Sequence, residues 1–170
     1  GIADPQRLGI AGWSYGGYMT MWAVTQTDRF KAAMAGAGIS NWRSFHGLTK
    51  YPTFDTTFYR ADPYDSDKES PYEMYSPLTY VKRVKTPTLI VQSEEDHRTP
   101  MATAEMWFQS LRAMGIQAEF VRYPRSNHDL SRNGEPWLLV DRLGRLRQWF
   151  GHFLLDNVAA TSSPMEKPTH

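Results

Sequence analysis

The 170-residue sequence has no cysteine, which excludes disulfide bonds and thiolate metal sites. It has no apolar run long enough to cross a membrane and no signal-peptide pattern. Neither sign of charge is in excess, because 19 Lys and Arg are matched by 18 Asp and Glu. This balance removes the electrostatic case for nucleic acid or an anionic membrane as a partner. We therefore expect no nucleic-acid or membrane partner and no metal or cofactor, with the cytoplasm as the default location.

Internal repeats, low-complexity segments and linkers are also absent, whereas aromatic residues make up 14% of the chain. A chain of this length can bury the core of one domain. We expect that domain to cover residues 1–155, followed by a flexible tail over residues 156–170. The sequence starts at Gly1 rather than at methionine, close to a strand-forming segment. This start indicates a fragment or a processed chain.

Apolar runs and turn signals predict alternating strands and helices. We expect strands over residues 7–11, 31–36, 88–92 and 118–123, and helices over residues 17–27, 101–114 and 137–155. A further helix is expected to start near Ser76-Pro77, with the proline in its first turn. On the last helix the predicted apolar positions are Leu138, Val140, Leu143, Leu146, Trp149, Phe150 and Phe153. This pattern predicts an α/β fold with a mostly parallel sheet flanked by helices.

Residues 39–70 lack a clear period and are rich in aromatic side chains. We expect this excursion on the catalytic side of the sheet, with two short helices whose ends the sequence does not define. Its aromatic residues are Trp42, Phe45, Tyr51, Phe54, Phe58, Tyr59 and Tyr64. Each one alone is best explained as cover for the sheet edge, but together they can line a pocket.

The motif Gly12-Trp13-Ser14-Tyr15-Gly16-Gly17 lies between the first strand and the first helix. A Gly-x-Ser-x-Gly turn in this position is the nucleophile elbow of α/β-hydrolases. We expect the three glycines to stand at positions with little room for a Cβ, and the Tyr15 backbone N–H to point toward a forming oxyanion. The alternative is a glycine-rich turn whose serine only caps a helix.

A serine nucleophile needs a histidine base and a carboxylate that orients the histidine. Ser14, Asp96 and His128 each follow a predicted strand, in the chain order of α/β-hydrolases. His97 is the one serious rival for the base, although it lies in the acid loop. The carboxylates of Glu94, Glu95 and Asp129 compete with Asp96, and spacing alone does not separate Glu94 and Glu95 from it.

The elbow, the Ser76-Pro77 helix, the run from Glu95 to Pro100 and Ser126-Asn127-His128 together resemble the catalytic domain of the prolyl oligopeptidase family. The acylaminoacyl-peptidase and dipeptidyl-peptidase branches are the most similar. The resemblance runs from about Arg7 to Leu155 and implies Ser14 as nucleophile, Asp96 as acid, His128 as base and the Tyr15 N–H as one oxyanion donor.

The chain departs from the pattern of this family in several places. Thr99 stands where valine is usual, and Asp129 follows His128 where a small residue is common. The upstream β-propeller is missing, as is the first half of the hydrolase sheet, whose loop supplies the second oxyanion donor. The resemblance therefore implies a serine hydrolase that cleaves short peptides or esters. The alternative is a non-catalytic truncated homologue that serves as an assembly or interaction subunit.

The missing first half of the sheet also bears on assembly. Without it, the strand at residues 8–11 becomes an exposed apolar edge, which favours pairing with another chain. We expect either two copies that pair these edges in a homodimer or higher homo-oligomer, or docking with a separate N-terminal half.

Overall fold

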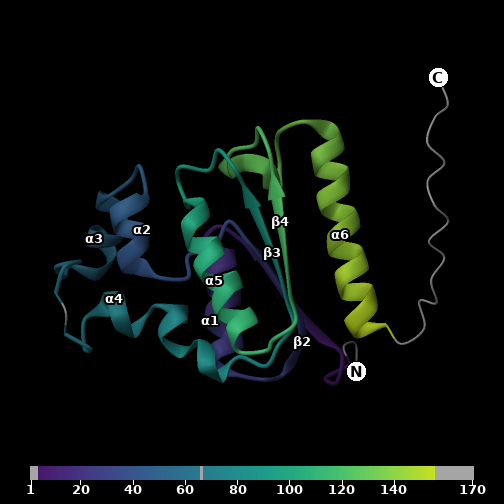
Figure 1. Ribbon diagram of the computed structural model, residues 1–170, viewed down its shortest axis with the longest axis horizontal. Coiled ribbons are helices and arrows are strands. Elements are labelled where there is room, and N and C mark those ends of the chain that lie inside the picture. Colours follow the sequence, from purple (N-terminus) through teal and green to yellow (C-terminus); the bar gives the residue numbers. More distant parts are fainter. Residues whose placement is uncertain (1–3, 66, 156–170) are drawn as a thin grey trace.

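The computed structural model describes residues 4–65 and 67–155 (Figure 1). Four strands form one parallel sheet in the order β1-β2-β3-β4, with bounds Leu8–Trp13, Phe30–Gly36, Thr88–Ser93 and Ala118–Tyr123. Every residue of β3 is buried, as expected for a central parallel strand that is covered on both faces. The four predicted strands are confirmed with small shifts at their ends: β1 begins at Leu8 and continues to Trp13, β2 begins at Phe30, and β3 ends at Ser93.

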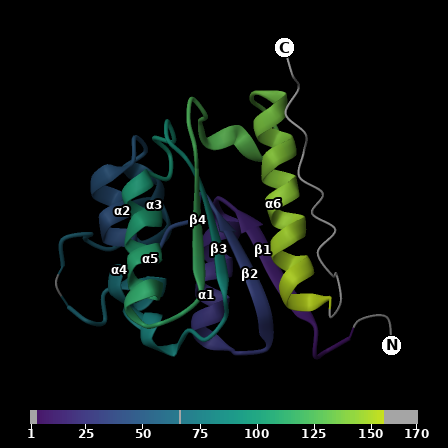
Figure 2. The same ribbon diagram turned by 45° about the vertical axis from the view of Figure 1, so that its right-hand side comes forward.

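Helices cover both faces of the sheet, as Figures 1 and 2 show. Helices α1 (Tyr15–Gln26) and α5 (Met101–Ala113) pack on one face, and α6 (Pro136–Leu154) packs on the other. A separate apolar cluster fills each interface, one around Trp107 and Met21 and one around Trp149 and Leu89. The predicted α/β class, with a parallel sheet flanked by helices, is confirmed.

The last helix differs from its predicted pattern at two positions. Leu138 and Trp149 are buried against the sheet, but Val140 and Leu143 are 70% and 55% exposed. Each residue turns a helix by about 100°, so Val140 lies about 200° and Leu143 about 140° from Leu138, on the outer side. Their predicted place on the core face was therefore wrong.

The excursion after β2 folds into short helices on the same side as α1 and α5. Two of them, α2 (Trp42–Leu48) and α3 (Thr53–Tyr59), lie within residues 39–70 as expected. Helix α4 (Pro71–Met74) follows, and the segment that begins at Pro77 is a 3-10 helix, η1 (Pro77–Arg83). Their shared core consists of Tyr18, Ile39, Trp42, Phe45 and Tyr72.

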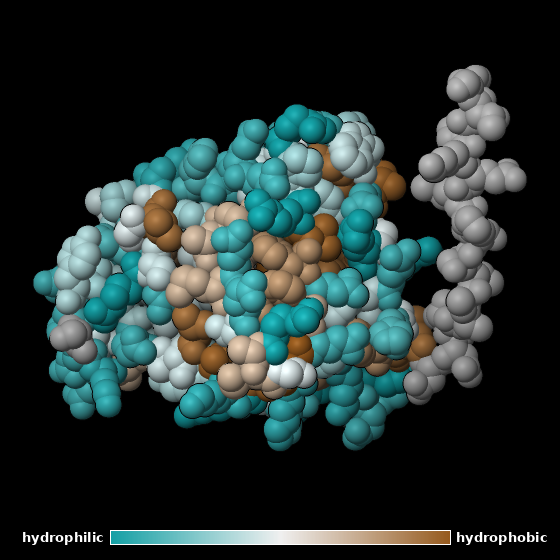
Figure 3. Space-filling view, viewed as in Figure 1, coloured by the Kyte–Doolittle hydropathy of each residue, from teal (hydrophilic) through white to brown (hydrophobic). Residues whose placement is uncertain are grey.

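The two edges of the sheet differ. Among the described residues only β2 pairs with β1, and Gly9 and Ala11 are exposed on it. At the other edge, Phe120 of β4 packs on Phe108 of α5 with ring centroids 5.5 Å apart. Figure 3 shows apolar side chains gathered over this region and polar ones around them.

Two further sequence predictions concern the tail and membrane-spanning segments. The tail predicted over residues 156–170 lies outside the described residues. Within residues 4–65 and 67–155, the structure contains no helix with the length and apolar character needed to span a membrane.

Candidate active site

Ser14 occupies the turn between β1 and α1 in a conformation that few residues other than glycine adopt. Its φ is 61° and its ψ is −119°. Such a backbone is strained and persists only where its surroundings enforce it. Here the Ser14 N–H donates to the Gly36 carbonyl at 2.9 Å, and the Ser14 carbonyl accepts from the Tyr18 N–H at 2.9 Å. The end of β2 and the first turn of α1 thus hold the serine in place.

The glycines of the elbow have different roles. A Cβ on Gly12 would overlap the Gly16 carbonyl, and a Cβ on Gly17 would overlap the Gly36 carbonyl. At Gly16, however, a Cβ would meet no atom within 4 Å. The expectation that all three glycines lack room was therefore wrong for Gly16, because it is the backbone at Gly16, rather than its Cβ position, that approaches Gly12.

His128 lies beside the serine, at the start of the 3-10 helix η2 (His128–Ser131). Its Nε2 is 2.8 Å from Ser14 Oγ, and the residue is 7% exposed. The Trp13 indole N–H donates to the His128 carbonyl at 2.8 Å. The residue before the nucleophile therefore anchors the loop that carries the histidine.

Asp96 completes a chain of hydrogen bonds from the other side of the imidazole. Its Oδ2 is 2.8 Å from His128 Nδ1, and the residue is 3% exposed. An ionised carboxylate only accepts hydrogen bonds, so Nδ1 carries the proton and Nε2 is left to accept from the Ser14 hydroxyl. The geometry matches the arrangement that activates a serine.

The Asp96 carboxylate has further donors that keep it ionised. Oδ1 accepts from the Arg98 and Thr99 backbone N–H groups, both at 2.9 Å, and Oδ2 accepts from the Thr99 hydroxyl at 2.8 Å. Burial acts to raise the pKa of Asp96, but the hydrogen bonds from His128 and Thr99 outweigh it and lower the pKa below its ordinary value. These donors therefore keep the buried Asp96 carboxylate ionised.

The rival carboxylates and histidines lie elsewhere. Glu94 is paired with Arg122 at 3.3 Å, Glu95 is exposed, and Asp129 is paired with Arg132 at 2.9 Å. His97 is exposed, and His46 is bonded to Asp55. The structure therefore joins Ser14, His128 and Asp96 and leaves the alternatives apart.

The loops that carry the acid and the base are tied together by backbone hydrogen bonds. The Glu94 N–H donates to the Tyr123 carbonyl and the Glu95 N–H donates to the Ser126 carbonyl, both at 2.9 Å. These contacts explain why side chains 32 residues apart in the sequence meet at hydrogen-bond distance.

Tyr15 is the first residue of α1, so its backbone N–H has no acceptor within the helix. The positive end of the helix dipole lies at the same place. This N–H, next to the nucleophile in the chain, is suited to donate to an oxyanion.

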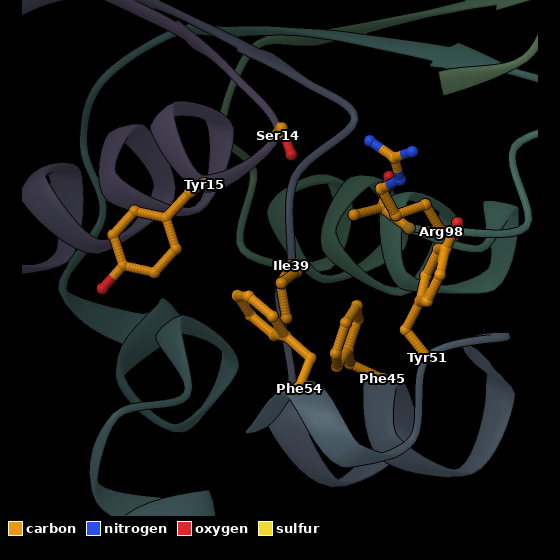
Figure 4. A pocket seen from close by; sticks show the side chains of 8 residues that line it. Ser14, Tyr15, Ile39, Phe45, Tyr51, Phe54 and Arg98 are labelled. Carbon is orange, nitrogen blue, oxygen red and sulfur yellow. The ribbon is translucent and has the colours of Figure 1, made fainter. Parts of the chain in front are cut away.

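A pocket of about 480 Å³ opens beside Ser14 (Figure 4). Ser14, Tyr15, Arg98 and Thr99 form one part of its lining, and Ile39, Phe45, Tyr51 and Phe54 form the other. In Figure 4 the Ser14 hydroxyl faces the space above the rings of Phe45 and Phe54. Three aromatic residues of the excursion thus line the pocket, whereas Phe58 and Tyr64 are 65% and 73% exposed and do not.

No cluster of three or more His, Cys, Asp or Glu side chains suited to a metal ion occurs in the part of the chain that the structure describes.

A nucleophile elbow after a parallel strand, with an acid and a histidine after later strands, defines the α/β-hydrolase class. Within this class, residues 1–154 match the prolyl oligopeptidase family, peptidase S9. The chain belongs to this peptidase family, and the resemblance inferred from its motifs is confirmed.

Similar proteins lie in the same family. The uncharacterized peptidase YuxL of Bacillus subtilis is 44% identical over 89% of this chain and 23% of its own length. An acylamino-acid-releasing enzyme of Arabidopsis thaliana is 32% identical over 90% of this chain and 20% of its own length. The solved acylaminoacyl peptidase of Pyrococcus horikoshii superposes with a TM-score of 0.85 at 33% identity, over 93% of this chain and 26% of that protein. The chain thus spans about a fifth to a quarter of the length of these relatives.

Proposed function

We propose that this chain carries the nucleophile, base and acid of a serine hydrolase that works through an acyl-enzyme. The observation that supports this proposal most directly is the hydrogen-bond chain from Ser14 Oγ to His128 Nε2 and from His128 Nδ1 to Asp96 Oδ2, with 2.8 Å at each step.

In the first half of the reaction, His128 Nε2 takes the hydroxyl proton as Ser14 Oγ bonds to the carbonyl carbon of the substrate. The carbonyl oxygen becomes an oxyanion, to which the Tyr15 N–H donates. His128 then gives its proton to the leaving amine or alcohol as the bond to the carbonyl carbon breaks. Asp96 orients the imidazole and stabilises its charged form.

In the second half, a water molecule gives a proton to His128 and attacks the acyl-enzyme carbonyl. The ester bond to Ser14 breaks, and His128 returns the proton to Ser14 Oγ. The products are a carboxylic acid and the restored enzyme. A donor besides Tyr15 strengthens the oxyanion site, and we propose that it comes from outside this chain, in the part that the longer relatives possess.

The lining of the pocket supports a proposal for the substrate class. Its walls of Ile39, Phe45 and Phe54 favour an apolar side chain on the acyl group, and the Arg98 guanidinium at the rim offers N–H donors to a peptide carbonyl. Relatives are named as acylamino-acid-releasing enzymes, and one solved neighbour is named as a puromycin-hydrolyzing peptidase. We propose that the substrates are short peptides from whose N-terminus an acylated residue or a dipeptide is released, with activated esters cleaved more readily.

We also propose that strands outside this chain pair with the free edge of β1. The sheet order and the chain's share of its relatives support a preceding part of a longer protein as that partner. Light scattering of the isolated chain checks this point, because a well-folded monomer would argue against a need for edge pairing, and a dimer would favour a second copy instead.

The kinetic test compares an anilide and a p-nitrophenyl ester that share one N-acyl phenylalanine group. The complete protein that carries this chain should cleave both, with a burst of nitrophenol as the acyl-enzyme accumulates. Ser14→Ala should abolish the burst and the turnover. A folded wild-type protein that cleaves neither compound would favour the non-catalytic homologue.

A further inference from the structure

A second buried carboxylate lies outside the catalytic centre, within the short helices beside the pocket. Asp55 of α3 is fully buried. Its Oδ2 is 2.9 Å from His46 Nδ1 of α2 and accepts from the Tyr72 hydroxyl of α4 at 2.6 Å. One oxygen atom therefore joins three successive short helices.

These helices depend on such contacts. Helices α2 and α3 have seven residues each and α4 has four. Isolated helices of this length are not stable in water, so tertiary contacts must hold them. Among the described residues Asp55 Oδ1 has no hydrogen-bond partner, so the two bonds to Oδ2 are the polar contacts that compensate the buried carboxylate.

The Tyr72 hydroxyl is suited to donate a hydrogen bond to Asp55. It is completely buried. Burial raises the pKa of its hydroxyl, and the hydrogen bond to Asp55 raises it further, so the hydroxyl keeps its proton.

The network sits directly behind the pocket lining. His46 follows Phe45 in the sequence, and Asp55 follows Phe54. Both phenylalanines line the pocket, and their ring centroids are 6.2 Å apart. Successive side chains on a helix point about 100° apart. Each helix can therefore direct its phenylalanine into the pocket, as Figure 4 shows, and its polar residue toward Tyr72.

We propose that Asp55, bonded to His46 and Tyr72, is a positioning residue that holds Phe45 and Phe54 as pocket walls and thereby sets the preference for large apolar acyl groups. This inference rests on the proposed function. It assigns the selectivity of the site to a carboxylate that touches no substrate.

Two substitutions test the inference in the complete protein. Tyr72→Phe removes one oxygen atom and keeps the ring. Asp55→Asn keeps an acceptor toward His46 and Tyr72 but removes the charge. Each variant is expected to lower kcat/KM for an N-acyl phenylalanine ester about tenfold relative to the matching alanine ester, mainly through KM. The double variant should lose little more than either single variant, because both act on one network.

Tyr64→Phe is the matched control, because it removes a hydroxyl from a tyrosine that is 73% exposed and keeps the ring, which packs edge-on against His46 with centroids 5.7 Å apart, so it should leave the ratio unchanged. If Tyr72→Phe and Asp55→Asn leave the ratio of the two kcat/KM values unchanged, whether or not both values fall, the inference is overturned. If Asp55→Asn does not fold, Tyr72→Phe decides the matter. A fluorophosphonate probe that labels Ser14 in the wild type and in the variants separates a failure of this inference from a failure of the proposed function, which predicts that labelling.

Discussion

The Thr99 hydroxyl donates to Asp96 Oδ2 at 2.8 Å, the same oxygen that lies 2.8 Å from His128 Nδ1. Thr99 Oγ1 is also 3.3 Å from His128 Nδ1. Thr99 thus contacts Asp96 directly and shares one carboxylate oxygen with His128.

Replacing Thr99 by valine should change the pH dependence of activity. The hydrogen bond from the Thr99 hydroxyl is among the smaller causes that lower the pKa of Asp96, and Thr99→Val removes it while keeping the bond from the Thr99 backbone N–H, so the substitution should raise that pKa toward its ordinary value. The carboxylate then holds the protonated imidazole more strongly. The acid limb of the kcat/KM profile should therefore move to higher pH.

Thr103→Val is the control for this change, because Thr103 is also buried but bonds to Gly38 and Pro100 carbonyls. Profiles that coincide for wild type and Thr99→Val, measured from pH 4 to 9, would show that the Thr99 hydroxyl does not tune the acid.

Asp96→Asn should lower kcat by about 10³–10⁴-fold, because an amide favours the wrong tautomer of the histidine. Glu95→Gln, one residue away and exposed, should change kcat by less than about twofold. Steady-state kinetics of both variants, with circular dichroism to check folding, provide the measurement. A large loss in Glu95→Gln with a small one in Asp96→Asn would reverse the assignment of the acid.

The elbow glycines offer a stability test with a matched pair. Gly12→Ala places a methyl group on the Gly16 carbonyl and should destabilise the fold by about 1–3 kcal/mol. Gly16→Ala meets open space within α1 and should be neutral or stabilising by up to about 1 kcal/mol. Urea unfolding compares the two variants. Equal destabilisation would contradict the packing described for the turn.

The pocket wall can be tested with Phe54 and Phe58, which lie four residues apart on α3. Phe54 lines the pocket and Phe58 does not. Phe54→Ala should lower kcat/KM for an N-acyl phenylalanine ester about tenfold more than Phe58→Ala. The loss in Phe58→Ala is expected to be smaller but not zero, because its ring packs on Phe54 with centroids 5.1 Å apart. An unchanged kcat/KM in Phe54→Ala would mean that the acyl side chain binds elsewhere.

Much of the site could be predicted from the sequence because parallel strands present their carboxyl ends at one edge of a sheet. Ser14, Asp96 and His128 each follow such a strand, so their meeting is a consequence of topology. The choice of Asp96 over Glu94 and Glu95 was not accessible by spacing, since it depends on which side chain the loop buries.

Other features depend on contacts that no local pattern reports. The bonds from His46 and Tyr72 to Asp55 join helices whose ends the sequence does not define. The exposure of Val140 and Leu143 on α6 depends on which stripe of the helix faces the sheet. The space around Gly16 depends on how closely the turn folds back on Gly12.

The proposed function requires Ser14 to be an activated nucleophile. The most direct measurement is labelling of the complete protein by a fluorophosphonate probe, with intact-mass and peptide analysis and with Ser14→Ala alongside. We expect one adduct per chain, located on Ser14 and absent from Ser14→Ala. A folded wild-type protein that takes up no probe, or a Ser14→Ala variant that is labelled as well as the wild type, would contradict the proposed function.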